Sequence, residues 1–210
     1  MKKLFILVIA FLLFSSTAHA FLINRGTDTL GNRLIYDDDF DITWYDISNS
    51  IDTWDNQVAW ADGLSVDFGG TIFDGWRLPT ALNQDDSGPD FGFNVTGSEM
   101  GHLYYTELNI DGGGSLNNPG NFQNLISSVY WSGTELATDT NDAWNFGIVN
   151  GGQGTVLKSE GSYALAVRSG DVASDPVPEP ATIALLGFGL AGLAGAEVRR
   201  RRKKKAVENN

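Results

Sequence analysis

The sequence predicts an α+β fold in which two helices pack on an antiparallel sheet of several short strands. Three observations lead to this prediction. Glycine is abundant, with 25 in 210 residues, and the six tryptophans all lie between the two ends of the chain; this composition is typical of loop-rich domains with an aromatic core. Several short apolar runs alternate with polar residues, as half-buried strands do. Only two segments have the spacing of an amphipathic helix.

The strands are predicted from short runs of β-branched and aromatic residues. They cover residues 34–36, 42–45, 72–73, 129–132, 143–149, 155–158 and 162–168. The pair Asn150–Gly151 lies between two of them and predicts a type I′ hairpin turn. Residues 84–97 and 109–120 are rich in Gly, Asn and Asp, so we expect them to form loops.

The first helix is predicted over residues 54–62, with Thr53 or Asp52 as its cap. Its apolar residues recur at i, i+4 and i+7, which places them on one face. The second helix is predicted to begin after Ser98, whose hydroxyl can accept a hydrogen bond from the first turn. Its inner stripe is formed by Met100, Leu103, Tyr104 and Leu108.

The first 20 residues have the features of a secretory signal peptide. Lys2 and Lys3 precede an apolar stretch over residues 4–14, and Ala18–Ala20 is a cleavage motif. Cleavage there would leave Phe21 as the first residue of the mature chain. An uncleaved anchor is the alternative, but the apolar stretch is short for a membrane span.

The C-terminus carries a second targeting signal. A proline-containing motif precedes an apolar run, and its prolines disfavour helix just before the membrane. A basic cluster follows the run and would stop transfer on the cytoplasmic side. The motif is Val177, Pro178, Glu179 and Pro180, and the cluster is Arg199, Arg200, Arg201, Arg202, Lys203, Lys204 and Lys205. Together they resemble the PEP-CTERM sorting signal, which implies export, at least transient anchoring in the inner membrane, and processing by an exosortase.

The predicted sorting helix covers residues 181–198 and the basic tail covers 199–210. Its apolar part ends at Ala196 and would extend about 24 Å, less than the ~30 Å hydrocarbon core of a bilayer. Such a marginal span suits a segment that is later removed. A permanent tail anchor is the alternative.

Between the two targeting signals lies enough chain for one domain. We expect a lead-in over residues 21–33, the domain over 34–171 and a linker over 172–180. Residues 21–176 contain 23 acidic and five basic residues, a net charge of −18. Such a surface repels nucleic acid, which we exclude as a partner.

The absence of cysteine excludes thiol nucleophiles, Cys-ligated zinc and Fe–S clusters. His102 is the only histidine after the signal peptide, so a multi-histidine metal site is also excluded. We expect this histidine to lie on a helix face and to meet a neighbouring carboxylate. The chain therefore offers few routes to catalysis.

Five motifs occur in an order that resembles the Lcl C-terminal domain family. They are GWRLPT (75–80), SEMGHLYY (98–105), YWSGTE (130–135), AWNF (143–146) and AVRSGD (166–171). The resemblance spans residues 34–171. It implies a C-type-lectin-like fold, with two helices on a twisted antiparallel sheet and long loops on one side. It also implies a surface or matrix protein that could bind glycan, without implying an enzymatic activity.

Four residues of these motifs are candidates for ligand binding. An indole can stack on a sugar face, and a guanidinium can hold a carboxylate. The alternative is structural, with the indoles in the core and the guanidinium in an ion pair. The candidates are Trp76, Arg77, Trp131 and Trp144.

Calcium is the one cofactor that the sequence suggests. The segment ELATDTND brings together oxygen ligands of the kind that calcium needs, namely Glu135, Asp139, Asn141 and Asp142. A solvated acidic loop is the alternative. Residues 37–41 form a second acidic cluster, with the same two interpretations.

The sequence therefore predicts an exported cell-surface or extracellular-matrix protein that could bind exopolysaccharide through lectin-like loops, and not an enzyme. A structural matrix protein with no specific ligand is the first alternative. A hydrolase is the remote one, because paired catalytic carboxylates cannot be identified among so many acidic residues.

Overall fold

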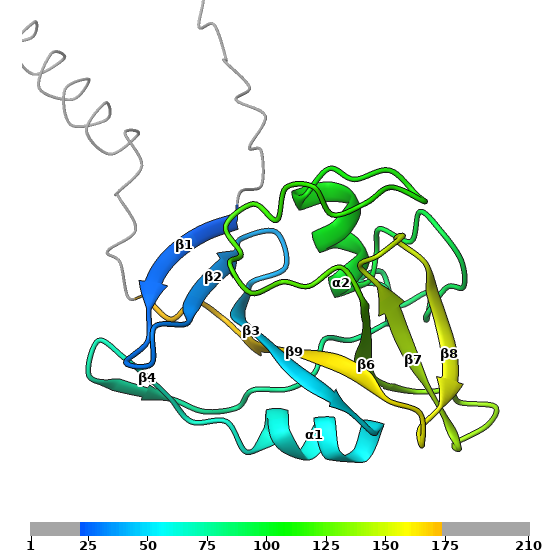
Figure 1. The fold of residues 1–210 in the computed structure, drawn as a ribbon, viewed down its shortest axis with the longest axis horizontal. Coiled ribbons are helices and arrows are strands. Elements are labelled where there is room, and N and C mark those ends of the chain that lie inside the picture. The colour runs from blue at the N-terminus through cyan, green and yellow to red at the C-terminus, as the bar shows by residue number, and fades with distance from the viewer. Residues whose placement is uncertain (1–21, 174–210) are drawn as a thin grey trace, which may run out of the picture. The chain divides into compact units, whose positions relative to one another are not determined.

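A seven-stranded sheet organises the protein in the computed structural model, which describes residues 22–173 (Figure 1). The strand order is β1-β2-β3-β9-β6-β7-β8. Neighbouring strands are antiparallel, except that β6 and β9 pair in parallel. The strands are β1 (Leu22–Thr27), β2 (Arg33–Asp37), β3 (Ile42–Asp52), β6 (Val129–Glu135), β7 (Asp142–Gly147), β8 (Gln153–Leu157) and β9 (Ser162–Ser169).

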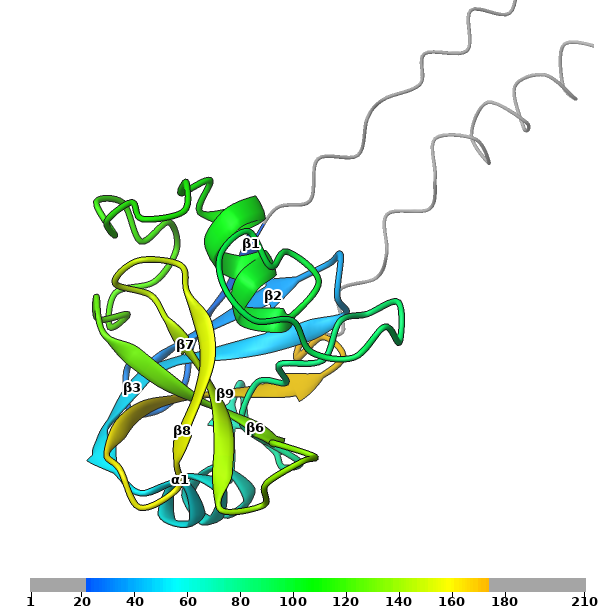
Figure 2. The ribbon, with the colours of Figure 1, turned by 90° about the vertical axis from the view of Figure 1, so that its right-hand side faces the viewer.

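Two helical segments cover opposite faces of this sheet, as Figures 1 and 2 both show. The first is α1 (Trp54–Asp62), which is followed by a small hairpin of β4 (Val66–Phe68) and β5 (Thr71–Phe73). The second is α2 (Glu99–His102), which continues directly into a π-helical turn, η1 (Leu103–Glu107).

The start of α2 is fixed locally. The hydroxyl of Ser98 accepts a hydrogen bond from Gly101 N–H at 3.2 Å, which satisfies one of the free donors at a helix start. A Cβ at Gly101 would lie 1.8 Å from the carbonyl oxygen of Val95. Only glycine fits at that position, and it allows the backbone at Val95 to pack closely against the first turn of α2.

Two hydrophobic cores lie on the two faces of the sheet, and the alternation along β9 separates them. Leu165 and Val167 belong to the core that includes the α2 and η1 residues Met100, Leu103 and Tyr104. Ala164 and Ala166 belong to the core on the α1 side, with the small side chains leaving room for larger neighbours. Because successive side chains of a strand point to opposite faces, one central strand supports both cores.

The structure confirms the α+β class, the bounds of α1 and the capping role of Ser98. It also shows strands that were not predicted, above all β1, which lies in the expected lead-in. β1 is a partly exposed edge strand, and its pairing with β2 shifts register between Asn24 and Gly26. Its sequence therefore does not need the strict alternation of apolar and polar residues from which strands are predicted. The lectin-like part of the fold prediction stays a prediction.

The type I′ turn at Asn150–Gly151 was a wrong prediction. A type I′ turn needs positive φ at both central residues, and of the two only Gly151 has it, at +81°. Gly147 N–H instead donates to Gly152 O at 2.8 Å. The connection between β7 and β8 is therefore a longer loop, which allows Ile148 to be buried in the core.

The signal peptide, the sorting motif, the apolar segment 181–198 and the basic tail lie outside the described residues. From Leu22 to Ala173, none of the helices combines the length and the apolar character that crossing a bilayer requires.

Candidate functional site

A cleft of about 590 Å³ lies between the β2–β3 turn and the long segment that connects β5 to α2. Polar side chains and three phenylalanines line it together. The lining residues are Phe40, Asn83, Gln84, Asp85, Ser87, Asp90, Phe91, Phe93, Asn94, Val95, Thr96 and Gly97. Ligand sites typically combine aromatic faces with a few polar groups in this way.

Two phenylalanines of this cleft are unusually exposed. The exposed fraction is 64% for Phe91 and 55% for Phe93. The Phe91 ring lies on the buried indole of Trp144, with the ring centroids 4.2 Å apart and the planes inclined by 44°. Trp144 thus supports an exposed ring from below, which leaves the outer face of Phe91 free of the core.

Side-chain hydrogen bonds fix the polar wall of the cleft. Asn83 Nδ2 donates to Asp90 Oδ2 at 2.7 Å and to Ser87 Oγ at 3.0 Å. Gln153, at the start of β8, donates through Nε2 to the carbonyl oxygen of Asp90 at 2.8 Å. These contacts tie the loop to the sheet, so the cleft is held in shape although it is formed mostly by irregular chain.

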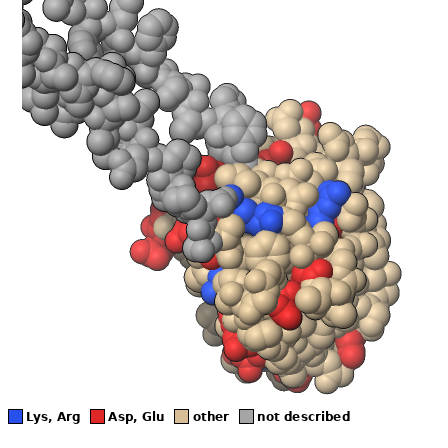
Figure 3. Space-filling model, turned by 90° about the vertical axis from the view of Figure 1, so that its left-hand side faces the viewer, with Lys and Arg blue, Asp and Glu red and all other residues tan. Residues whose placement is uncertain are grey.

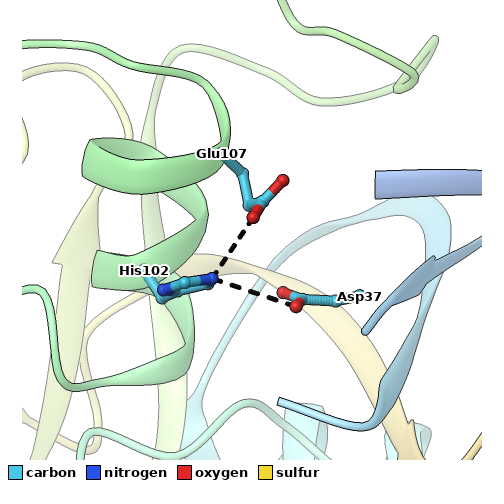
Figure 4. A group of neighbouring side chains, drawn as sticks. All are labelled: Asp37, His102 and Glu107. Carbon is cyan, nitrogen blue, oxygen red and sulfur yellow. Dashed lines mark ion pairs between the residues drawn. The ribbon is translucent and has the colours of Figure 1, made fainter. Parts of the chain in front are cut away.

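A second group of polar residues lies where the β2–β3 turn meets the end of the helical segment (Figure 4). His102 Nε2 lies 3.3 Å from Glu107 Oε1, 3.5 Å from Asp39 Oδ2 and 3.9 Å from Asp37 Oδ1. One potential ligand atom from each of Asp37, His102 and Glu107 lies within 4.8 Å of the others. The expectation that His102 meets a carboxylate is confirmed.

The environment of this cluster opposes charge on the carboxyl groups. Burial raises the pKa of Asp37, while the neighbouring His102 and the Phe40 N–H act in the opposite direction. Burial also raises the pKa of Glu107, and the charge of Asp37 adds to this effect. Neither pKa is affected by a lysine or arginine. The cluster therefore holds negative charge at a cost in free energy.

The structure places the three predicted indoles in the core and not on a binding face. The exposed fraction is 2% for Trp76, 0% for Trp131 and 2% for Trp144. Two of the ring nitrogens have backbone partners, since Trp76 Nε1 donates to Phe73 O at 2.8 Å and Trp131 Nε1 to Asp52 O at 3.1 Å. In this conformation they cannot stack on a sugar, because β6 and β7 are covered on both faces where Trp131 and Trp144 lie, and Trp76 packs against Tyr45 in the segment after β5.

Arg77 likewise has a structural partner. It donates to Glu99 through Nη1 at 2.8 Å and through Nη2 at 2.6 Å. The Glu99 side chain is only 3% exposed, and it also accepts the backbone N–H of Thr80 at 2.7 Å. The guanidinium therefore neutralises a buried acid at the start of α2, which is the alternative role expected for it.

The predicted calcium ligands do not converge in the structure. Glu135 forms an ion pair with Lys158, whose ammonium also lies 4.2 Å from the centroid of a Trp54 ring. Asp139 Oδ1 accepts hydrogen bonds from the backbone and side chain of Asn141 at 3.0 and 2.9 Å. Within residues 22–173, Asp142 forms no close group with these two acids. Calcium at this loop stays a prediction.

The sequence interpretation did not select the residues that line the cleft. Phe91 and Phe93 lie in a segment expected to be a loop, where no periodic element can bury them. Two phenylalanines separated only by Gly92 in such a segment could have indicated an exposed aromatic pair.

The acidic cluster at residues 37–41 and His102 are both candidates from the sequence, but no sequence pattern predicts that they lie close together.

A family model of the PEP-CTERM protein-sorting motif matches residues 176–202. The match includes the Val177–Pro180 motif and the basic residues up to Arg202, but it does not extend into the described domain. It supports export and sorting by an exosortase system, with membrane anchoring before cleavage. No curated protein and no solved structure matches the chain.

Proposed function

We propose that this exported protein acts at the cell surface or in the extracellular matrix by binding exopolysaccharide in the cleft below Phe91 and Phe93, without catalysis. The sorting motif supports export and exosortase processing. The cleft combines exposed aromatic rings with polar groups, whereas a larger hollow of about 700 Å³ beside Asp139 and Lys158 is lined by no aromatic side chain.

One observation carries the proposal, namely the exposure of two phenyl rings beside a polar wall. Two exposed phenyl rings at the mouth of a cleft offer apolar surface to a ligand, and this supports a binding surface here. The flat face of a sugar ring presents C–H groups that pack on an aromatic ring, and its hydroxyls need polar partners. Phe91 and Phe93 offer the first, and Asn83, Gln84 and Asp90 are placed to offer the second.

Charge narrows the class of glycan. Asp85 and Asp90 line the cleft. Acidic residues greatly outnumber basic ones in the domain, and both kinds are present on the face drawn in Figure 3. An anionic polysaccharide would be repelled by this surface. We therefore expect a neutral polymer or one that contains amino sugars.

The test is a binding assay with the full chain in a polyoxyethylene detergent, which has no sugar headgroup to compete. Neutral, amino-sugar and uronic-acid polysaccharides are compared, each with calcium and with chelator. We expect binding to the first two classes, and at least a tenfold loss of affinity when Phe91 and Phe93 are both changed to Ala.

Leu30→Ala is the matched control, because Leu30 is 81% exposed and does not line the cleft. Binding that disappears with chelator and returns with calcium, but not with Zn²⁺ or Mn²⁺, would support calcium at the Glu135–Asp142 loop. No binding to any polysaccharide of the panel, or binding that the double Phe91 and Phe93 variant leaves unchanged, would contradict the proposal and favour a structural matrix protein.

A further inference from the structure

The strongest unexplained feature of the described domain is the Nε2 atom of His102. The side chain of His102 is 8% exposed, and Nε2 is buried without a hydrogen-bond partner. Figure 4 shows this atom directed toward Asp37 and Glu107. A buried polar atom that lacks a partner costs about 1–3 kcal/mol, so such an atom needs an explanation.

Negative charge accumulates around the same atom. The side chains of Asp37 and Glu107 are 0% and 4% exposed, and Asp39 joins them from the surface with 46% exposure. The five basic residues between Leu22 and Ala173 all contact other groups. Buried carboxylates are normally paired with a cation or bound to a metal.

We propose that Asp37, His102 and Glu107 bind one divalent transition-metal ion, such as Zn²⁺ or Mn²⁺, with Asp39 as the fourth ligand. Two ligand atoms at about 2.0–2.1 Å from a tetrahedral ion lie about 3.4 Å apart. The distances from His102 Nε2 to Glu107 and Asp39 are 3.3 and 3.5 Å, and Asp37, at 3.9 Å, must move closer. Asp39 must also approach the other two carboxylates, because it lies outside the group whose ligand atoms are within 4.8 Å of one another. These separations suit ligands of a shared ion.

The donor set decides the class of metal. Calcium and magnesium take oxygen ligands, whereas an imidazole nitrogen with carboxylates suits zinc, manganese or iron. Three carboxylates and a neutral imidazole would leave only one negative charge after a divalent ion binds. The ion would thus remove most of the charge that the buried cluster now holds.

Contacts outside the ligand set already orient it. The Phe40 N–H donates to Asp37 Oδ1 at 3.3 Å, and Trp44 Nε1 lies 3.5 Å from Asp37 Oδ2. The Phe40 ring stacks on His102, with the centroids 4.1 Å apart and the planes inclined by 21°. Such outer contacts commonly orient metal ligands. The ion would connect the β2–β3 turn to the end of η1, independently of any glycan in the neighbouring cleft.

The experiment measures metal uptake by the full chain in detergent. The protein is stripped with chelator, dialysed against micromolar Zn²⁺ or Mn²⁺, and analysed for bound metal. We expect one ion per chain, with affinity reduced at least tenfold by Glu107→Gln and by His102→Gln. Asp38→Asn is the matched control, since it removes an exposed charge from the same turn, and it should leave the affinity unchanged.

Nitrogen NMR of the histidine rings tests the same site without relying on a variant that folds. Only one ring in the folded domain, that of His102, should shift when the ion binds. Unchanged ring signals at full metal loading, or uptake that Glu107→Gln and Asp38→Asn reduce equally, would show diffuse binding to an acidic surface and overturn the proposal. Failure to bind either metal, or binding of calcium alone, would overturn it as well.

Discussion

The buried carboxylates at the two ends of one helical segment have different partners. At its start, Glu99 receives two hydrogen bonds from Arg77 and a third from the backbone of Thr80. At its end, burial and the charge of Asp37 raise the pKa of Glu107, while His102 and the Leu22 N–H act in the opposite direction and no lysine or arginine contributes. The first carboxylate has a full set of partners, whereas the second shares one histidine with another buried acid.

This difference distinguishes a structural charge from a candidate functional one. A buried ion pair with full hydrogen bonding can hold two segments together, here the chain after β5 and the start of α2. A buried cluster with excess negative charge lowers stability unless a ligand binds. Perturbed carboxyl groups gathered in this way are frequent at functional sites.

The largest effect is expected from Arg77→Met. This change leaves Glu99 buried with only the Thr80 N–H as a partner. The Arg77 side chain is 41% exposed, so we expect a cost at the lower end for buried pairs, about 3 kcal/mol of unfolding free energy. Urea unfolding of the full chain, followed by tryptophan fluorescence, measures the loss. Arg168→Met is the control, because within the described residues Arg168 contacts the backbone Asp74 O at 3.5 Å and lies 5.0 Å from the centroid of the Phe73 ring, and neither is an acidic side chain. A loss under 1 kcal/mol for Arg77→Met would show that the pair is not structural.

A buried carboxylate with backbone partners should have the next largest effect. Asp46 is fully buried and accepts the N–H groups of Gln123 and Asn124 at 2.7 and 3.0 Å. We expect Asp46→Ala to cost about 2 kcal/mol, because two donors lose a charged acceptor. The same urea series measures it, with Asp62→Ala as the exposed control at the end of α1. Equal losses in the two variants would contradict the argument.

The parts of the fold that the sequence predicted are those that local spacing determines. The apolar residues of α1, the cap at Ser98 and the inner stripe of the second helix all depend on residues within one or two turns. The role of β1 could not be predicted in this way, since its pairing with β2 supplies what its sequence pattern lacks.

The candidate site depends on contacts between distant parts of the chain. Asp37 and His102 are 65 positions apart, and they meet only because the β2–β3 turn faces the end of α2. The burial of the three indoles depends on distant contacts in the same way. Their aromatic character suits both stacking and burial, the two roles that the sequence leaves open, and the chain packed around them buries them.

The stability of the protein at alkaline pH tests the hydrogen bonds of the buried Tyr45 hydroxyl. Tyr45 donates its hydroxyl to Asp28 and accepts Asn32 Nδ2 at 2.9 Å. Burial, followed by the hydrogen bond to Asp28, raises the pKa of Tyr45 to about 12 from 10.0. Because the folded pKa lies above the unfolded one, this stabilisation is complete below pH 10 and is lost as the pH rises toward 12.

We expect Tyr45→Phe to cost about 1 kcal/mol at neutral pH, the usual contribution of one hydrogen bond. The stability of Tyr45→Phe should also fall less steeply than that of the unchanged protein as the pH rises from 10 to 12. Thermal melts across this pH range provide the measurement. Tyr36→Phe is a useful companion, because Tyr36 also has its pKa raised to about 12 but contacts Asp41 near the surface. A Tyr45→Phe curve as steep as that of the unchanged protein would contradict the assignment.

The smallest effect is expected from Glu107→Gln in metal-free protein, where the comparison between the two ends of the helical segment becomes sharpest. Glutamine keeps the shape and an acceptor oxygen but removes the charge of a carboxyl group whose pKa is raised by burial and by Asp37. Stability at neutral pH should therefore change by less than about 0.5 kcal/mol, or rise slightly. Urea unfolding with chelator present measures this change.

The same Glu→Gln change at Glu99 provides the matched control, because there it weakens the ion pair with Arg77 and should clearly destabilise the protein. Saturating Zn²⁺ or Mn²⁺ should then reverse the result at position 107, since the unchanged protein would gain stability from the ion and the variant would not. A loss above 1 kcal/mol for Glu107→Gln without metal would mean that the free cluster already satisfies this carboxylate. The two ends of the segment would then be alike, and the proposed metal site would lose its main support.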